Sequence, residues 1–127
     1  MYVIQYNMFE RCETMKDNQL REQMVTELRR GTQIILVLNA LDDPQYGYSL
    51  LQKLEKIGIN IEAGTLYPLL RRLDAQGLLE SIWDTNESRP RKYYQLNDQG
   101  KMILDELKHA WLDIVKDMEV LFKEKIK

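Results

Sequence analysis

A single amphipathic segment constrains the fold of this 127-residue chain more than any other part. Residues 64–79 read GTLYPLLRRLDAQGLL, and their leucines recur with the period of an α-helix. At about 100° per residue, four of them share one face and point into a core: Leu66, Leu69, Leu70 and Leu73. The opposite face carries basic and aromatic side chains together with a proline: Tyr67, Pro68, Arg71 and Arg72. Gly77 ends the predicted helix, because that position commonly needs a residue that tolerates positive φ.

The proline inside this helix affects where the helix begins. The ring of Pro68 would clash with the carbonyl four residues earlier, and one backbone hydrogen bond is lost. The residue four earlier is Gly64, which adapts most easily, so we predict that the helix begins near Gly64. The alternative is a helix that starts later, at Pro68, with residues 64–67 in a loop.

A short β-hairpin follows the helix. Residues 78–83 and 92–96 have the composition of strands and are separated by a polar turn. Three cations gather near the predicted tip: Arg89, Arg91 and Lys92. Side chains alternate along a strand, so one of Tyr93 and Tyr94 should face inward and at most one outward. A helix followed by a basic hairpin is typical of a winged helix-turn-helix, which binds DNA, whereas an isolated hairpin of this kind would simply be solvated.

Three further helices are predicted upstream. Residues 16–30 form a short amphipathic helix whose apolar residues recur every four positions: Leu20, Met24 and Leu28. Thr32 is expected to cap a second, nearly all-apolar and therefore buried helix, which runs to Leu41 and is broken by Asp42, Asp43 and Pro44. The third spans residues 46–57, ends at Gly58 and turns four side chains inward: Leu50, Leu51, Leu54 and Ile57.

The last helix carries a different apolar pattern. Asn97 is a plausible N-cap for a helix that runs from about Asp98 to the C-terminus. Its apolar residues follow 3-4-3-4-3 spacing, the a/d seam of a heptad: Leu104, Leu107, Trp111, Ile114, Met118 and Leu121. Water cannot satisfy so much apolar surface, so we expect a two-fold dimer in which this helix packs on its partner and on the partner's N-terminal helix. The alternative is a monomer whose last helix folds back onto its own domain.

The predicted fold is therefore mainly α with a small β-hairpin, a winged helix-turn-helix plus a C-terminal dimerisation helix. We expect three segments. Residues 1–15 form an N-terminal arm, residues 16–97 a winged helix-turn-helix DNA-binding domain with its leading helix, and residues 98–127 the dimerisation helix.

Several of these motifs resemble one family. GTLYPLLRRL, QGLLES and PRKYYQL, preceded by ELRRGTQIILVLNAL and YGYSLLQKLEKIGI, are similar to the PadR-like transcriptional regulators, and the resemblance covers residues 27–100. The layout resembles the short type, with a single C-terminal dimerisation helix. The resemblance implies a sequence-specific DNA-binding regulator, expected to be a homodimeric repressor on a palindromic operator.

Helix geometry and the resemblance together indicate the residues that contact DNA. The start of a recognition helix enters the major groove, so Thr65, Tyr67 and Pro68 are the candidates for base and sugar contacts. Arg71 and Arg72 lie further along and are expected to neutralise phosphates. Arg89, Arg91 and Lys92 are expected to reach the backbone or the minor groove from the hairpin.

Trp111 is a candidate for ligand binding. In some short members of this family an aromatic residue at the matching place lines a cavity between the two subunits, which implies a small, flat aromatic effector. The alternative is that Trp111 only fills the dimer seam. Two other functions remain: a winged-helix protein-interaction module, disfavoured because its docking face should be apolar, and a constitutive DNA binder without an effector.

Composition excludes other classes. The net charge of −2 argues against a uniformly basic DNA-coating protein, although local clusters still set the field at a contact surface. With one cysteine, Cys12, and one histidine, His109, the chain has no metal-ligand cluster, and it has no phosphate-binding loop, so we expect neither a cofactor nor enzyme activity. No apolar run approaches the roughly 20 residues that span a bilayer, and no signal sequence is recognisable, so we expect a cytoplasmic protein.

Overall fold

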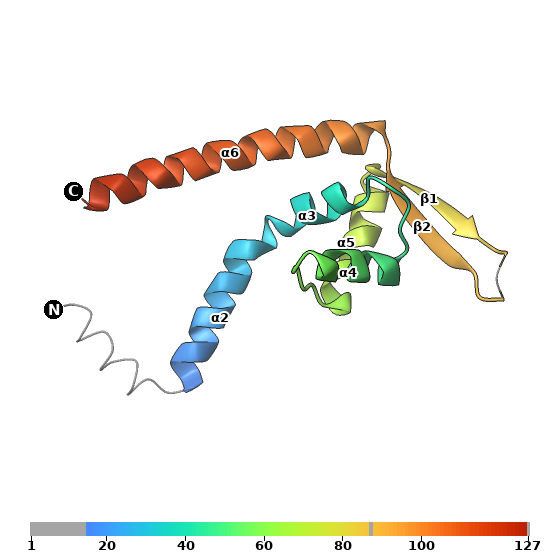
Figure 1. Cartoon of the computed structure of the whole chain (residues 1–127), viewed down its shortest axis with the longest axis horizontal. Helices are drawn as coiled ribbons and strands as arrows, with labels where there is room; N and C mark the ends of the chain where they lie inside the picture. The colour runs from blue at the N-terminus through green and yellow to red at the C-terminus, as the bar shows by residue number, and fades with distance from the viewer. Residues whose placement is uncertain (1–14, 87, 127) are drawn as a thin grey trace. The chain divides into compact units, whose positions relative to one another are not determined.

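The computed structural model describes residues 15–86 and 88–126 and is mainly helical with one antiparallel hairpin, as predicted (Figure 1). The elements follow in the order α2 (Met15–Arg30), α3 (Gln33–Ala40), α4 (Gly47–Lys56), α5 (Ala63–Ala75), β1 (Leu79–Asp84), β2 (Arg91–Leu96) and α6 (Asp98–Ile126). Contacts divide the chain into two compact units, with the boundary between Gln33 and Ile34. All of the predicted N-terminal arm except Met15 lies outside the described residues.

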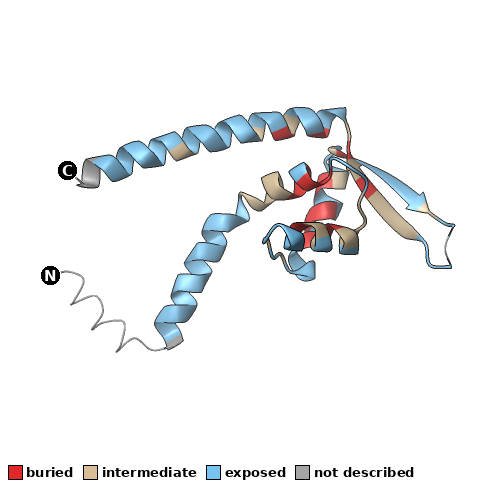
Figure 2. Ribbon diagram, in the orientation of Figure 1, coloured by how far each residue is buried: buried red, intermediate tan, exposed pale blue. Residues whose placement is uncertain are grey.

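In the first unit, α2 leaves its apolar side chains exposed (Figure 2). They are Leu20, Met24, Val25 and Leu28. At the end of this helix the hydroxyl of Thr32 donates to the carbonyl of Arg29 over 2.8 Å. Thr32 therefore closes α2, where we had predicted that it caps the next helix, although α3 does begin one residue later.

The core of the second unit is built mainly from the leucines of three helices and is sealed by the hairpin. The buried members from these three helices and the residue after α3 are Val37, Leu38, Ala40, Leu41, Leu50, Leu54, Leu66, Leu69, Leu70 and Leu73. All four leucines predicted on α5 are therefore buried. The prediction for Ile57 is wrong, because its side chain is 68% exposed. Ile57 is the C-cap residue of α4, with φ −98° and ψ 14°, so the backbone has already left the helix and no longer follows its period.

Both α4 and α5 end in the same backbone motif, as their glycines predict. Gly58 and Gly77 have φ of +84° and +81°, a region that residues with a Cβ rarely adopt. After α5 the amide of Leu78 donates to the carbonyl of Leu73 over 3.1 Å, and α4 ends with the equivalent bond. This is the Schellman arrangement, which satisfies carbonyls at the helix end and turns the chain sharply. It sets where α5 stops and the hairpin starts.

The hairpin forms the wing. Strands β1 and β2 are antiparallel, in a register that pairs Leu79 with Leu96 and Asp84 with Arg91. The connector after α3 adds a single bridge on the other side of β2, where Gln45 and Tyr94 exchange backbone hydrogen bonds of 2.9 and 2.8 Å. Tyr94 is buried and its neighbour Tyr93 is only half-buried, so one of the two tyrosines faces inward as predicted.

A lysine fixes the connector between α3 and α4. The Nζ of Lys53 donates to the carbonyl of Ala40 (2.8 Å) and to the carboxylates of Asp42 (2.7 Å) and Asp43 (2.6 Å). Partial burial acts to lower the pKa of Lys53, but the hydrogen bonds that it donates to Asp42 and Asp43 outweigh this effect and raise that pKa. The hydrogen bond from Lys53 lowers the pKa of Asp43. The turn that ends α3 is thus tied to α4 by charge as well as by packing.

The first turn of α6 is attached to the end of α5. Asn97 is the predicted N-cap: its side-chain oxygen accepts from the amide of Gly100 over 2.8 Å, and its side-chain nitrogen donates to the carbonyl of Gly77 over 2.8 Å. Gly100 is buried so closely that a Cβ there would overlap the carbonyl of Leu78. Because α5 ends at the same backbone, the start of α6 cannot move without moving that segment.

Further along α6, burial decreases quickly (Figure 2). Leu104 is 8% exposed and belongs to the core, and Leu107 packs against the core. Our assignment of Leu104 to a dimer seam is therefore corrected, because its own domain already covers it. The remaining seam residues are all between 43% and 47% exposed: Trp111, Ile114, Met118 and Leu121.

Candidate nucleic-acid interface

A groove of about 620 Å³ lies between the start of α4, the outer face of α5 and the wing. It is lined by Tyr46, Gly47, Tyr48, Tyr67, Leu70, Arg71, Arg89, Arg91, Lys92 and Tyr94. Four of these side chains are cationic, four are tyrosines, and none of the ten described lining residues is acidic. A groove of this composition attracts an anionic chain and offers aromatic faces and hydroxyl donors beside it.

The structure brings five of the eight predicted DNA-contact residues to this groove. These are Tyr67, Arg71, Arg89, Arg91 and Lys92. Thr65, Pro68 and Arg72 are exposed on α5 but do not line the groove. Thr65 and Arg72 are seven positions apart, which is close to two helical turns, so they share the other side of the outer face.

Pro68 lies inside α5, which excludes a helix that starts at the proline. The helix begins at Ala63, one residue before the predicted Gly64, and Glu62 is its N-cap. The carbonyl of Glu62 accepts from the amides of Thr65 and Leu66, each over 2.9 Å. Thr65 therefore sits in the first turn, at the end of the helix that typically enters a groove of DNA.

The wing cations are placed differently from our prediction of three charges at the hairpin tip. Of the three, Arg89 lies in the connecting turn, whereas Arg91 and Lys92 lie in β2. The difference arises because β2 begins at Arg91 and pairs as far as Asp84, which leaves a shorter turn than the composition suggested.

Lys92 is tied back to the helix that precedes the wing. Its Nζ lies 3.1 Å from Oδ2 of Asp74 in α5 and 5.3 Å from the ring centre of Tyr94. The hydrogen bond that Lys92 donates to Asp74 raises the pKa of Lys92 against the opposing effect of burial. In the free chain, Lys92 thus braces the wing against α5.

Arg91 is held on the other side of β2 by an aromatic pair. Its guanidinium carbon lies 4.5 Å from the ring centre of Tyr46, and Tyr46 contacts Tyr93 edge-to-face with ring centres 5.3 Å apart. Such stacking is a cation–π contact. Arg89, by contrast, is exposed in the turn. Arg71 and Arg89 are therefore the two groove cations for which no ion pair or cation–π contact is found among the described residues.

Sequence reasoning missed the start of α4. Tyr46, Gly47 and Tyr48 all line the groove, and Tyr48 is 56% exposed. The signal was present in the sequence YGYS, where two aromatic residues flank a glycine at the start of a helix. Their role depends on how α4 approaches α5, which no local pattern reveals.

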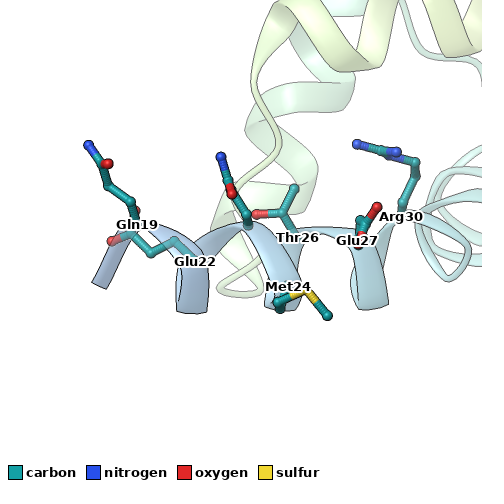
Figure 3. A pocket seen from close by; sticks show the side chains of 7 residues that line it. Gln19, Glu22, Met24, Thr26, Glu27 and Arg30 are labelled. Atoms are coloured by element: carbon teal, nitrogen blue, oxygen red, sulfur yellow. The ribbon is translucent and has the colours of Figure 1, made fainter. Parts of the chain in front are cut away.

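A second hollow, of about 640 Å³, belongs to α2 alone (Figure 3). It is lined by Gln19, Glu22, Gln23, Met24, Thr26, Glu27 and Arg30. Carboxylates, amides and one arginine alternate there as on an ordinary solvated helix, and no group of side chains converges on one point. The volume of this hollow alone does not make it a binding site. The slightly smaller groove between α4, α5 and the wing has the side chains suited to binding.

The described part of the chain holds no group of side chains that could bind a metal ion. No three His, Cys, Asp or Glu side chains come together in it. His109 is exposed on α6, with Nδ1 2.9 Å from the carbonyl oxygen of Asp105, one helical turn away. Within residues 15–86 and 88–126, no helix is both long and apolar enough to cross a membrane.

Comparison with known proteins identifies the family. Residues 35–106 match the model of the transcriptional regulator PadR-like family. The transcriptional regulator Rv3488 of Mycobacterium tuberculosis is 31% identical over 90 residues, which cover 71% of this chain and 84% of that protein.

Solved structures agree. A PadR family transcriptional regulator from Eggerthella lenta is 47% identical, with a TM-score of 0.80, over 86% of this chain and 97% of that one. A PadR-like transcriptional regulator from Bacillus cereus is 29% identical, with a TM-score of 0.65, over 76% and 96%. These relatives are described as regulators and not as enzymes. This chain therefore belongs to the PadR-like family of winged-helix, DNA-binding transcriptional regulators.

Proposed function

We propose that this regulator is a homodimeric repressor that binds a palindromic operator with α5 and the wing, and that a small aromatic effector releases it. The observation that carries the proposal is the grouping of four cations around one groove in a chain whose net charge is −2. Cations grouped in this way make one surface attractive to an anionic partner, whereas a DNA-coating protein is basic over its whole surface. A protein-interaction module would instead need an apolar face at this position.

The proposed DNA contacts divide into two kinds. Thr65, Tyr67 and Pro68 lie in the first half of α5 and are proposed to contact bases and sugars, since side chains there reach the major groove. The cations of α5 and the wing are proposed to neutralise phosphates: Arg71, Arg72, Arg89, Arg91 and Lys92. Among these, Lys92 already pairs with Asp74 and gives up that pair if it binds a phosphate.

The proposed dimer rests on α6. Its 29 residues extend about 43 Å at 1.5 Å per residue, and beyond Leu107 the apolar stripe of Trp111, Ile114, Met118 and Leu121 is exposed. A second copy supplies the matching stripe and the exposed apolar side of its own α2, so that one two-fold contact covers both. Two recognition helices roughly 34 Å apart then meet successive turns of one DNA face.

The proposed effector site is at Trp111, which is 43% exposed on the same stripe. Two such indole rings across a two-fold axis offer flat apolar area to an aromatic compound. A constitutive DNA binder would share every feature above except the response to this compound. Only the response to an effector separates these two functions, so the effector needs its own test.

The first experiment measures DNA binding against salt. A duplex that the wild-type protein enriches from a random library serves as operator, with a scrambled duplex of equal composition as reference. Arg71→Ala and Arg89→Ala should each flatten the slope of log K against log salt by about 0.9. Lys123→Ala, which removes an exposed cation far along α6, is the matched control and should leave the slope unchanged. If Arg71→Ala and Arg89→Ala keep the wild-type slope, as Lys123→Ala should, the groove is not part of the DNA interface.

The second experiment tests the effector. In the Trp83→Phe variant, which silences the exposed tryptophan of β1, a naphthalene-type compound should quench Trp111 and release the operator over the same concentration range. A ligand shifts the equilibrium only by its differential affinity for the two states. Quenching with unchanged operator affinity would leave a constitutive DNA binder as the function.

A further inference from the structure

The start of α4 and the outer face of α5 meet at a glycine. Gly47 is the first residue of α4, and a Cβ placed on it would overlap the ring of Tyr67, with Cδ1 at 3.0 Å and Cζ at 3.2 Å. The backbone does not require glycine there, because the positive φ values among the described glycines belong to Gly58 and Gly77. The missing side chain at position 47 is therefore explained by the close approach of Tyr67.

The ring of Tyr67 is confined on more than one side. It packs against the hydrophobic core, touches the backbone of Gly47 and also lines the basic groove beside Arg71. A tyrosine has two side-chain torsions, and the contacts of the ring with the core and with Gly47 restrict both of them. A side chain that is already fixed loses less conformational freedom when it binds a partner.

We propose that Gly47 is a positioning residue for operator recognition: it lets the Tyr67 ring lie against the start of α4 and so holds Tyr67 ready for its base contact. This inference rests on the proposed function, because Tyr67 must contact the operator. Gly47 itself need not touch DNA. The sequence YGYS thus serves recognition through a residue twenty positions away.

The expected effect of a methyl group at position 47 separates positioning from folding. Alanine forms helix better than glycine, so the substitution favours α4 itself. The same methyl would overlap the Tyr67 ring, so the ring must leave its position. A rigid ring cannot avoid the overlap by a small local bend, as the end of a flexible side chain can. Gly47→Ala should therefore keep a cooperative fold and lose discrimination between operator and scrambled DNA.

The test is a double-mutant cycle on the selected and scrambled duplexes. Gly47→Ala and Tyr67→Ala should each reduce the ratio of the two affinities by roughly tenfold or more, the size of one base contact. The double variant should match Tyr67→Ala within about twofold, because Gly47 then has nothing to position. Gly31→Ala adds the same methyl where nothing lies within 4 Å of it, and should behave as wild type.

Two outcomes overturn the inference through DNA binding. Additive losses in the double variant mean that Gly47 acts independently of Tyr67, and an unchanged ratio in Tyr67→Ala means that there is no contact to position. If Gly47→Ala fails to fold, the comparison of Tyr67→Ala with the double variant still decides, because the overlap is absent from both.

A second measurement separates this inference from the proposed function. In the free protein, the ring signals of Tyr67 in NMR should shift in Gly47→Ala and stay unchanged in Gly31→Ala. Unshifted signals overturn the positioning role whatever the DNA does. A wild-type protein that binds both duplexes equally, with shifted signals in Gly47→Ala, would instead overturn the proposed sequence-specific function.

Discussion

Helices α5 and α6 carry similar apolar stripes, yet only α5 buries its own. The four leucines of α5 are at most 9% exposed, whereas the four outer residues of the α6 stripe are at least 43% exposed. On α6 only the first turns, with Leu104 and Leu107, reach the core. The spacing of apolar residues therefore shows which face of a helix must be covered, but it does not show what covers that face. One helix completes a domain, and the other keeps an exposed apolar surface, which we propose that a second chain covers.

The sharpest way to break this comparison is a charge on the exposed stripe. Ile114→Glu should leave the winged helix folded but convert the proposed dimer to monomer, because a buried unpaired carboxylate is costly. Specific DNA binding should then fall toward the non-specific level, a loss of about 10³ or more. Sedimentation and binding to the selected duplex measure both effects.

Leu112→Glu is the matched control on another side of α6, at a residue that is 58% exposed. It should leave assembly and DNA binding close to wild type. An Ile114→Glu protein that stays dimeric would mean that the stripe is not the dimer contact, and a monomeric but fully active one would mean that DNA binding does not need the dimer.

A cavity in the core tests the other half of the comparison. Leu66 is fully buried in α5, so Leu66→Ala should lower the free energy of unfolding by about 2–5 kcal/mol. The same truncation at the exposed Leu121 should cost far less in isolated monomer, where no partner covers that side chain. Denaturant titrations of both variants in the Ile114→Glu background supply the values. Similar losses would contradict the division into a closed and an open stripe.

A smaller effect is expected where the wing is braced against α5. Asp74→Asn removes the charge that pairs with Lys92, at a site where both side chains are partly exposed, and should cost about 0.5–1 kcal/mol of stability. Lys92 can then neutralise a phosphate without first giving up this pair, so the affinity for the selected duplex should rise while the slope of log K against log salt stays near that of the wild type. A salt titration with the selected duplex measures this change. An unchanged affinity would show that Lys92 stays away from DNA even when it is unpaired.

The smallest effect concerns pH and the connector before α4. The hydrogen bond from Lys53 lowers the pKa of Asp43 in the folded protein. That contact therefore stabilises the fold at pH values above 3.8, the ordinary pKa of the carboxyl group. The contribution is lost as the pH falls through the lowered pKa. Asp43→Asn should therefore cost about 0.2–1 kcal/mol at pH 7, and the difference from wild type should shrink as the pH falls below about 4. Unfolding curves at pH 7 and pH 3 measure it, and an equal difference at both would assign the effect to something other than the charge.

Much of the fold could be predicted because its signals are local. The leucine spacing of α5, the positive-φ glycines at 58 and 77 and the N-cap Asn97 each report on a few neighbouring residues, and each is where the sequence indicates. The prediction for Ile57 was wrong because α4 ends at Lys56, one residue before the last apolar position of the helical pattern.

The candidate site was harder to predict because it depends on contacts between elements. The pairing of Lys92 with Asp74 joins residues 18 apart, and the contact of Gly47 with Tyr67 joins residues 20 apart. Neither is visible in a helical or strand period. Leu104 fits a heptad equally well whether its own core or a partner covers it, so spacing alone could not assign it.

The attachment of α6 at Asn97 and Gly100 makes the long helix a lever with a very short inner arm. At about 43 Å, a tilt of roughly 10° around its first turn moves the far end by about 7 Å while the anchored end barely shifts. Displacement is therefore reduced on the way from the tip of α6 to the end of α5, and force is amplified in the same proportion. The helix at the receiving end of this lever is α5, which we propose as the recognition helix.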